Sequence, residues 1–344
     1  MNRPPHVTAG RYAPPAAGRE LVAVSADGSR LHVEVHGPDG APAVVLSHGW
    51  TCSTAFWAAQ IRELARDHRV IAYDQRGHGR SPAAASYSTT ALADDLVAVL
   101  EATLAPGERA LVAGHSMGGM TVMAAAGRPR FTEHAAAVLL CSTGSSRLVA
   151  EATVLPLRPG RARTRITRGL LGSPAPLGPV TPATRAVLKY ATMGPGSAPE
   201  RVEACARIVH ACPAGVRRAW SQVLAGLDLD EGVAQLTVPT AVIVGRDDRL
   251  TPVVHARGLA AALPHCVGLT ELTGMGHMTP IEAPEAVSSA LRELTSRYLT
   301  TRAAATTGAA TSTVTSTATS TATTAAATPV ATAPTAPTEK EKTQ

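Results

Sequence analysis

Short apolar runs alternate with helix-like segments through most of this 344-residue chain. The runs lie at residues 43–46, 70–73, 111–113, 138–140, 241–244 and 267–269. Continuous apolar runs of this kind are typical of parallel strands that are buried on both faces. Segments of helical length and spacing lie between them, at 55–65, 90–104, 117–126, 253–263 and 284–299. The alternation predicts an α/β fold, a doubly wound and mostly parallel β-sheet with helices on both faces.

Two parts of the chain depart from this alternation. Residues 21–24 and 31–35 flank Asp27-Gly28 and predict an antiparallel hairpin. From about residue 145 to 230 no strand is predicted, but prolines and glycines separate three helix-like pieces, at 182–193, 199–212 and 213–227. A helical insertion between two parallel strands is expected over the carboxyl edge of the sheet, where ligands bind in such folds. We therefore expect a helical cap over about 145–230.

The two ends of the chain differ in composition from the middle. Several prolines lie within the first 19 residues, and residues 300–344 consist largely of Thr and Ala. Segments with few large apolar side chains cannot offset their conformational entropy by burial. The expected organisation is a disordered lead at 1–19, one α/β domain at 20–299 and a disordered tail at 300–344.

The net charge of +6 is unevenly distributed. Between Pro156 and Trp220 there are eleven Arg or Lys and two Glu, so this segment carries 11 − 2 = +9 and the rest of the chain 6 − 9 = −3. The positive charge lies in the expected cap, which does not favour a nucleic-acid partner. The cap arginines either steer an anionic substrate or form an ordinary solvated surface. They are Arg158, Arg161, Arg163, Arg165, Arg168, Arg217 and Arg218.

A candidate nucleophile follows the apolar run at 111–113. Ser116 stands in Gly114-His115-Ser116-Met117-Gly118, before a helix of small residues. A nucleophile on a tight strand-to-helix turn needs small neighbours two positions away on each side, so that the turn can close. Serine is a poor nucleophile at its free pKa and requires a base. The sequence therefore predicts a serine nucleophile with a histidine and an acid elsewhere in the chain.

His277 is the best candidate for the base, because Gly274-Met275-Gly276-His277 follows the last predicted strand. An acid must orient this imidazole, and Asp247 and Asp248 follow the strand at 241–244. Asp248 has the better spacing to the next helix, while Asp247 stays a possible alternative. The order Ser116, Asp248, His277, each after a different strand, is that of the α/β-hydrolases.

The chain resembles α/β-hydrolases of the serine esterase, lipase and haloperoxidase-like branch over about residues 20–299. Besides the serine motif it carries Ser47-His48-Gly49-Trp50 after one strand and Asp74-Gln75-Arg76-Gly77-His78-Gly79-Arg80-Ser81 after the next. The resemblance implies an oxyanion hole formed by the backbone N–H groups of Trp50 and Met117. It implies hydrolysis of a carboxylic ester through an acyl-enzyme, with a small-molecule ester or acyl substrate.

Other chemistries on the same triad stay open. These are hydrolysis of a thioester, a lactone or a carbon–carbon bond, and haloperoxidase-like perhydrolysis; a ligand-binding sensor on the same fold is the non-enzyme alternative. Trp220, Val223, Leu224 and Leu227 either line an acyl pocket with Trp50, Phe56 and Trp57 or pack the cap on the core.

No metal-binding motif and no glycine pattern for a dinucleotide are found, so we expect no cofactor and no metal. The five cysteines are widely spaced and form no C-x-x-C pair, which favours reduced thiols. No apolar stretch is long enough to span a membrane, and the first residues do not form a signal peptide. A cytoplasmic protein of unspecified oligomeric state is expected.

Overall fold

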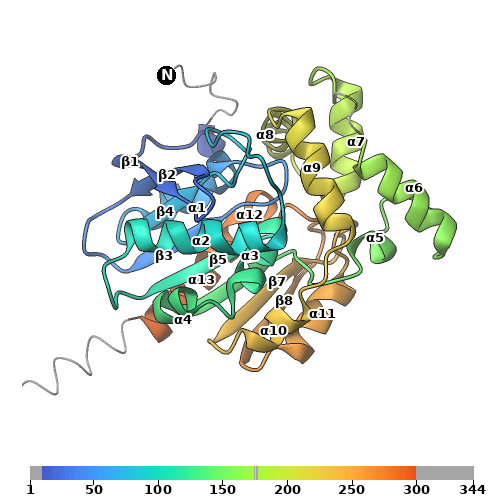
Figure 1. The fold of residues 1–344 in the computed structure, drawn as a ribbon. Helices are drawn as coiled ribbons and strands as arrows, with labels where there is room; N and C mark the ends of the chain where they lie inside the picture. The colour runs from blue at the N-terminus through green and yellow to red at the C-terminus, as the bar shows by residue number, and fades with distance from the viewer. Residues whose placement is uncertain (1–9, 174, 176, 300–344) are drawn as a thin grey trace, which may run out of the picture. The chain divides into compact units, whose positions relative to one another are not determined.

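The computed structural model describes residues 10–173, 175 and 177–299 (Figure 1). The chain divides into two units, Met1–Ala304 and Ala305–Gln344, and all described residues belong to the first. The predicted tail and residues 1–9 of the predicted lead lie outside the described residues. A short 3₁₀ helix, η1 (Gly10–Tyr12), precedes the first strand.

Within the described residues, eight strands form one sheet, in the order β1-β2-β4-β3-β5-β6-β7-β8. The two pairs β1–β2 and β2–β4 are antiparallel, and all other neighbours are parallel. Every predicted strand lies within an observed one, so the predicted α/β fold is confirmed. The strands are β1 (Arg19–Val24), β2 (Arg30–His36), β3 (Ala43–Ser47), β4 (Arg69–Tyr73), β5 (Ala110–His115), β6 (Ala135–Cys141), β7 (Thr240–Gly245) and β8 (Cys266–Leu272).

Helices cover both faces of the sheet (Figure 1). Alternate residues of a strand point to opposite faces, so Val112 and Leu111 of β5 belong to different apolar clusters. The face of Val112 packs against α2 (Thr89–Thr103), α3 (Met117–Ala125), α4 (Pro129–His134), α10 (Asp230–Gln235) and α11 (Val253–Ala262). The face of Leu111 packs against η2 (Thr54–Trp57), α1 (Ala58–Leu64), α12 (Thr279–Glu282) and α13 (Pro284–Tyr298).

Of the six described helices between β6 and β7, the first five form the cap. They are α5 (Leu148–Glu151), α6 (Arg161–Leu171), α7 (Pro182–Thr192), α8 (Pro199–His210) and α9 (Ala214–Ala225). The three predicted cap helices correspond to α7, α8 and α9, whereas α5 and α6 were not predicted. The two ends of the insertion meet where Ser146 pairs with Asp228 in an isolated β-bridge.

The cap contacts loops that follow the parallel strands. The indole N–H of Trp50, after β3, donates to the carbonyl of Arg217 at 3.1 Å. The indole N–H of Trp220 donates to the carbonyl of Arg76, after β4, at 3.2 Å. These contacts place the cap over the carboxyl edge of the sheet, as expected for an insertion of this kind.

All five cysteines are free, and Cys52, Cys141, Cys205 and Cys212 are buried. Burial raises the pKa of the Cys205 and Cys212 thiols to about 12, so these two side chains act as small apolar groups in the packing. Among the described residues, no helix combines the length and the apolar character needed to cross a membrane.

Candidate active site

Ser116 lies on a strained turn between β5 and α3. Its backbone has φ 51° and ψ −117°, which is unusual for a residue with a side chain. A Cβ atom on Gly114 would lie 2.3 Å from the carbonyl oxygen of Gly118, and one on Gly118 would lie 2.1 Å from that of Ser47. The two glycines are therefore required for the turn to close, as the sequence motif predicts.

His277 and Asp248 lie together at the ends of β8 and β7. The Nδ1 atom of His277 is 2.8 Å from Oδ2 of Asp248, and both side chains are buried. A neutral imidazole that donates from Nδ1 leaves Nε2 free to accept a proton. This tautomer is the one that a general base requires.

The carboxylate of Asp248 is held by its own loop. Oδ1 accepts the backbone N–H groups of Leu250 and Thr251, each at 2.9 Å, and Oδ2 accepts the Thr251 hydroxyl at 2.9 Å. Asp247 is partly exposed, and its backbone N–H donates to the carbonyl of Met275. In the described structure the carboxylate of Asp247 makes no hydrogen bond or ion pair. The geometry therefore favours Asp248 over Asp247 as the partner of His277.

Neighbouring groups also fix the backbone of His277. Its N–H donates to the carbonyl of Thr192, at the end of α7, at 2.8 Å. Its carbonyl accepts from Nε2 of His115 at 2.9 Å, and the His115 ring lies 5.0 Å from the His277 ring between centroids. Burial, followed by the charge of His277, holds the pKa of His115 well below its usual range. His115 therefore stays neutral and positions His277.

Trp50 and Met117 both lie close to Ser116 in the structure. A Cβ atom on Gly49 would lie 3.2 Å from Cβ of Ser116, so the Gly49–Trp50 segment approaches the serine closely. Met117 is the first residue of α3, where backbone N–H groups have no acceptor within the helix. Within the described residues, neither N–H donates to another backbone carbonyl. Both groups are therefore available to a ligand.

Two buried histidines support the loop that carries Trp50. Nε2 of His78 accepts the backbone N–H of Thr51 at 3.2 Å, and Nε2 of His48 accepts that of Gln75 at 3.0 Å. Thr51 has a positive φ of 64°, so the loop requires such support. Burial lowers the pKa of His48 to about 3, with a further contribution from His78, and burial lowers that of His78 to about 4.

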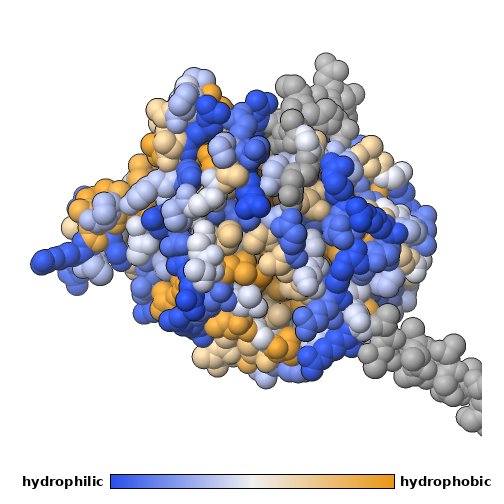
Figure 2. Space-filling view, turned by 180° about the vertical axis from the view of Figure 1, so that it is seen from behind, coloured by the Kyte–Doolittle hydropathy of each residue, from blue (hydrophilic) through white to orange (hydrophobic). Residues whose placement is uncertain are grey.

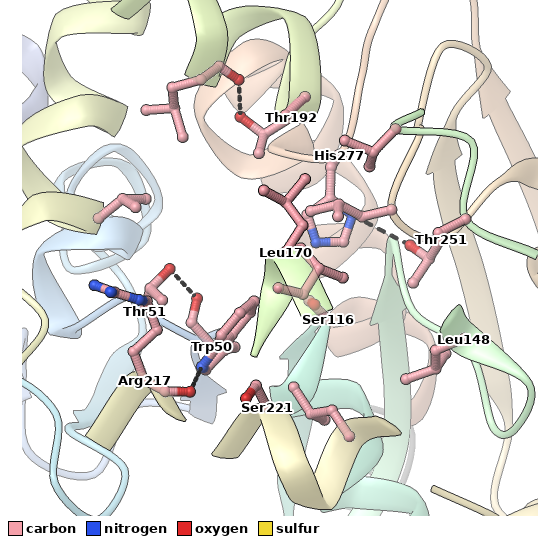
Figure 3. A pocket seen from close by; sticks show the side chains of 18 of the residues that line it. Trp50, Thr51, Ser116, Leu148, Leu170, Thr192, Arg217, Ser221, Thr251 and His277 are labelled. Carbon is pink, nitrogen blue, oxygen red and sulfur yellow. Dashed lines mark hydrogen bonds between the residues drawn. The ribbon is translucent and has the colours of Figure 1, made fainter. Parts of the chain in front are cut away.

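An apolar cavity of about 590 Å³ lies between the cap and this site. Trp50, Ser116 and His277 line it, and Figure 3 shows all three side chains around the same cavity. Aliphatic side chains from the cap and from neighbouring loops form much of the remaining wall. They include Leu148, Val149, Val154, Leu155, Leu170, Leu171, Leu177, Val187, Leu188, Val209 and Leu224.

The family model described as "Alpha/beta hydrolase family" matches residues 44–290. The chain belongs to the α/β-hydrolase family. The resemblance predicted from the sequence motifs is confirmed at this level, and the hydrolase fold agrees with the observed sheet.

Three known proteins illustrate what this hydrolase is similar to. RutD of Stutzerimonas stutzeri, whose name proposes carbamate hydrolase activity, is 30% identical over 74% of this chain and 92% of its own length. RutD of Variovorax paradoxus is 52% identical, but over 26% of this chain and 34% of that protein. The esterase of Thermogutta terrifontis has 24% identity and a TM-score of 0.67, over 82% of this chain and 99% of its own. The similarity to the Thermogutta terrifontis esterase is a similarity of fold alone.

Sequence reasoning about this hydrolase missed Glu282. Its buried carboxylate accepts the backbone N–H of Gly194 at 2.7 Å and the hydroxyl of Ser197 at 2.6 Å, both in the cap. It also accepts the N–H groups of Gly276 at 3.1 Å and Met278 at 3.0 Å, on either side of His277. A glutamate near the start of a predicted helix gave no signal of this role.

Two other expectations for the hydrolase have definite outcomes. Seven residues were expected either to line an acyl pocket or to pack the cap on the core. Trp50 and Leu224 line the cavity, whereas packing without a place in the lining is found for Phe56, Trp57, Trp220, Val223 and Leu227. Arg217 is buried and donates to the carbonyls of Ser173 and Ala175, in addition to lining the cavity. It therefore holds the cap together, which an interpretation based on charge alone does not anticipate.

Proposed function

We propose that this hydrolase cleaves a carboxylic ester through an acyl-enzyme intermediate. The observation that carries the proposal is the 2.8 Å hydrogen bond between His277 and Asp248, beside a strained serine in the same cavity. Ser116 is the nucleophile, His277 the general base, and Asp248 the residue that orients the imidazole. The backbone N–H groups of Trp50 and Met117 form the oxyanion hole.

The reaction has two similar halves. Oγ of Ser116 attacks the carbonyl carbon while Nε2 of His277 takes the hydroxyl proton. The tetrahedral oxyanion accepts hydrogen bonds from Trp50 and Met117, each worth about 3–4 kcal/mol in comparable sites. Collapse breaks the ester bond, and His277 returns its proton to the leaving alcohol. Water then attacks the acyl-enzyme in the same manner and releases the acid and free Ser116.

The cavity lining favours an ester with a large apolar group. About 590 Å³ of space next to Ser116 is enclosed largely by Leu and Val side chains. Burial of apolar substrate surface contributes about 25 cal/mol per Å² before the costs of binding. In the described lining no Asp or Glu is present. Of its two arginines, Arg217 is already bonded to carbonyls and Arg168 is exposed on the outer cap helix α6. These features support a neutral lipophilic ester over the carbamate suggested by the names of the relatives.

Labelling with a fluorophosphonate tests the nucleophile. We expect labelling of the native chain, none of Ser116→Ala, and full labelling of a control variant, Ser142→Ala, whose hydroxyl contacts Thr279 instead. Equal labelling of native protein and Ser116→Ala would overturn the assignment.

A series of p-nitrophenyl esters tests the substrate class. We expect kcat/KM to rise from acetate to octanoate and to exceed that for a p-nitrophenyl carbamate. A preference for the carbamate over every ester would favour the activity named for the relatives.

A further inference from the structure

Helix α6 buries polar side chains and exposes large apolar ones. Its buried residues are Arg163 and Thr167, whereas Ile166 is 53% and Leu170 54% exposed. A helix on the surface of a soluble domain normally shows the reverse arrangement, with apolar side chains toward the core. The outer side of α6 therefore has the character of a surface that contacts something other than water.

Helix α7 continues this exposed apolar surface. Only Thr192 of α7 is buried, while Val187 is 69% and Tyr190 45% exposed. Nine large hydrophobic side chains are exposed among the described residues, and six of these lie between residues 157 and 190. We call these six residues, with the exposed arginines between them, the cap face. The six are Leu157, Ile166, Leu170, Leu177, Val187 and Tyr190.

The cap face is strongly basic. Residues 152–199 contain seven Arg or Lys and no Asp or Glu. Arg158, Arg161, Arg165 and Arg168 are exposed, and within the described structure none of these four forms an ion pair. Figure 2 shows hydrophilic and hydrophobic side chains next to one another at the left, where the outer cap helices lie. Unpaired guanidinium groups among aliphatic side chains fit a partner with anionic groups above an apolar layer.

The cavity reaches the cap face. Leu170, Leu177, Val187 and Tyr190 are exposed and also line the cavity above Ser116. Arg168 is also exposed and also lines the cavity. The cap face therefore forms part of the rim of the cavity, so that a partner bound there would lie against the entrance to the candidate active site.

We propose that the cap face docks on an anionic lipid surface, with the arginines on lipid phosphates and the aliphatic side chains among the acyl chains. The ester then passes from the lipid layer into the cavity without crossing water. The docking is independent of the proposed ester hydrolysis, whereas this route for the substrate rests on it. Leu, Ile and Val side chains suit acyl chains, while a nucleic-acid surface would use aromatic side chains for stacking, of which the cap face has only Tyr190.

Vesicle co-sedimentation of the full chain tests the docking. The probes are vesicles of phosphatidylcholine alone and vesicles in which about a third of the lipid is phosphatidylglycerol. We expect binding to the anionic vesicles, weaker binding at high salt, and little binding to phosphatidylcholine. The Ser116→Ala variant should bind equally well, because docking does not require the serine.

A triple variant separates the cap face from the cavity. Arg161→Glu, Arg165→Glu and Ile166→Ser change residues that do not line the cavity. We expect the partition coefficient on anionic vesicles to fall at least about tenfold, since each basic residue near such a surface contributes several-fold. Hydrolysis of a soluble short-chain ester should be unchanged. The matched control is Arg19→Glu, Arg30→Glu and Val24→Ser, all exposed in the β1–β2 hairpin, and it should bind as the native chain does.

Three results would overturn the docking proposal. They are equal binding to both kinds of vesicle, unchanged binding of the triple variant, and a dimer in sedimentation equilibrium that the triple variant abolishes while vesicles stay unbound. Failure of the ester proposal has a different signature, which is normal vesicle binding by a native chain that cleaves no ester.

Discussion

The imidazole of His78 accepts the backbone N–H of Thr51 at 3.2 Å, and this bond supports the loop that carries Trp50. His48 accepts the N–H of Gln75 in the same way. Both imidazoles use Nε2 as the acceptor, so a proton on Nε2 would break the bond. The loop that carries Trp50 is therefore supported by these two bonds only while both histidines are neutral.

Stability should fall in mild acid. In the unfolded chain His48, His78 and His115 bind protons below about pH 6.5, whereas the folded pKa values of His48 and His78 are about 3 and about 4, and that of His115 is also low. The unfolded state then binds more protons, so the free energy of unfolding falls as the pH falls. Burial raises the pKa of Asp74 to about 6, so the folded state binds this proton more readily, and the contribution of Asp74 to stability increases as the pH falls. We expect the free energy of unfolding to decrease as the pH falls below 6, measured by urea unfolding.

A pair of histidine variants isolates one contribution to this slope. His78→Gln retains an acceptor for Thr51 but removes the titrating group, so the slope should fall by about 1.4 kcal/mol per pH unit. His265→Gln, at an exposed position, should retain the native slope. Equal slopes for all three proteins would contradict the role of His78.

Asp248 and Asp247 should differ sharply in their effect on catalysis. Asp248→Asn places an amide beside Nδ1 of His277 and favours the wrong tautomer, which lowers kcat by about 10⁴ in comparable triads. Asp247→Asn should change kcat/KM less than about threefold, because its side chain is partly exposed and the imidazole of His277 is bonded to Asp248 instead. Steady-state kinetics on a p-nitrophenyl ester measures both. The opposite order would assign the acid to Asp247.

Glu282→Gln should weaken both the cap and the His277 loop. The amide has one acceptor oxygen where the carboxylate accepts hydrogen bonds from Gly194, Ser197, Gly276 and Met278. We expect a loss of about 2–4 kcal/mol in the free energy of unfolding, because bonds to a buried charge are lost. Glu293→Gln, exposed on α13, is the matched control and should be neutral. If Glu282→Gln were as stable as the native protein, the hydrogen bonds of Glu282 would not be needed to hold the cap and the His277 loop.

Gly114→Ala should prevent correct folding of the turn at Ser116. The new Cβ would lie 2.3 Å from the backbone of Gly118, which has no flexible side chain that can move aside. We expect little soluble protein and no fluorophosphonate labelling. Gly258→Ala, in α11, meets no atom within 4 Å, and should stabilise the chain by about 0.5–1 kcal/mol. The unfolding temperature of each variant is the measurement. A soluble, active Gly114→Ala protein that unfolds at the native temperature would contradict the steric argument.

The sheet could be predicted because its strands are buried on both faces and read as short apolar runs. The turn at Ser116 was also predictable, since the steric requirement for Gly114 and Gly118 is local. The pairing of Asp248 with His277 could be predicted only as one of two alternatives. Asp247 and Asp248 are adjacent in one loop, so their sequence context is nearly the same. Their side chains point in different directions, and only the structure shows which of them reaches His277.

Other features leave no pattern that can be recognised in the sequence. Helix α6 was not predicted, although Ala162, Ile166 and Leu170 recur every four residues, because most of the segment consists of Arg and Thr. Arg217 could not be distinguished from Arg218 by charge, although the first is buried and the second is exposed. Glu282 acts on loops that are about 85 residues away in the chain, at Gly194 and Ser197, and such contacts depend on the complete fold.

The hydrogen bond from the N–H of His277 to the carbonyl of Thr192 limits how this molecule can open. A cap that moved away as a rigid body would pull on the backbone of His277, the proposed general base, and disturb its alignment with Asp248 in each turnover. Motion that admits substrate is therefore best confined to the outer part, α6 and the start of α7, while the end of α7 stays fixed. Substrate and product would then enter and leave as α6 and the start of α7 move, while His277 and the loops around it keep their positions.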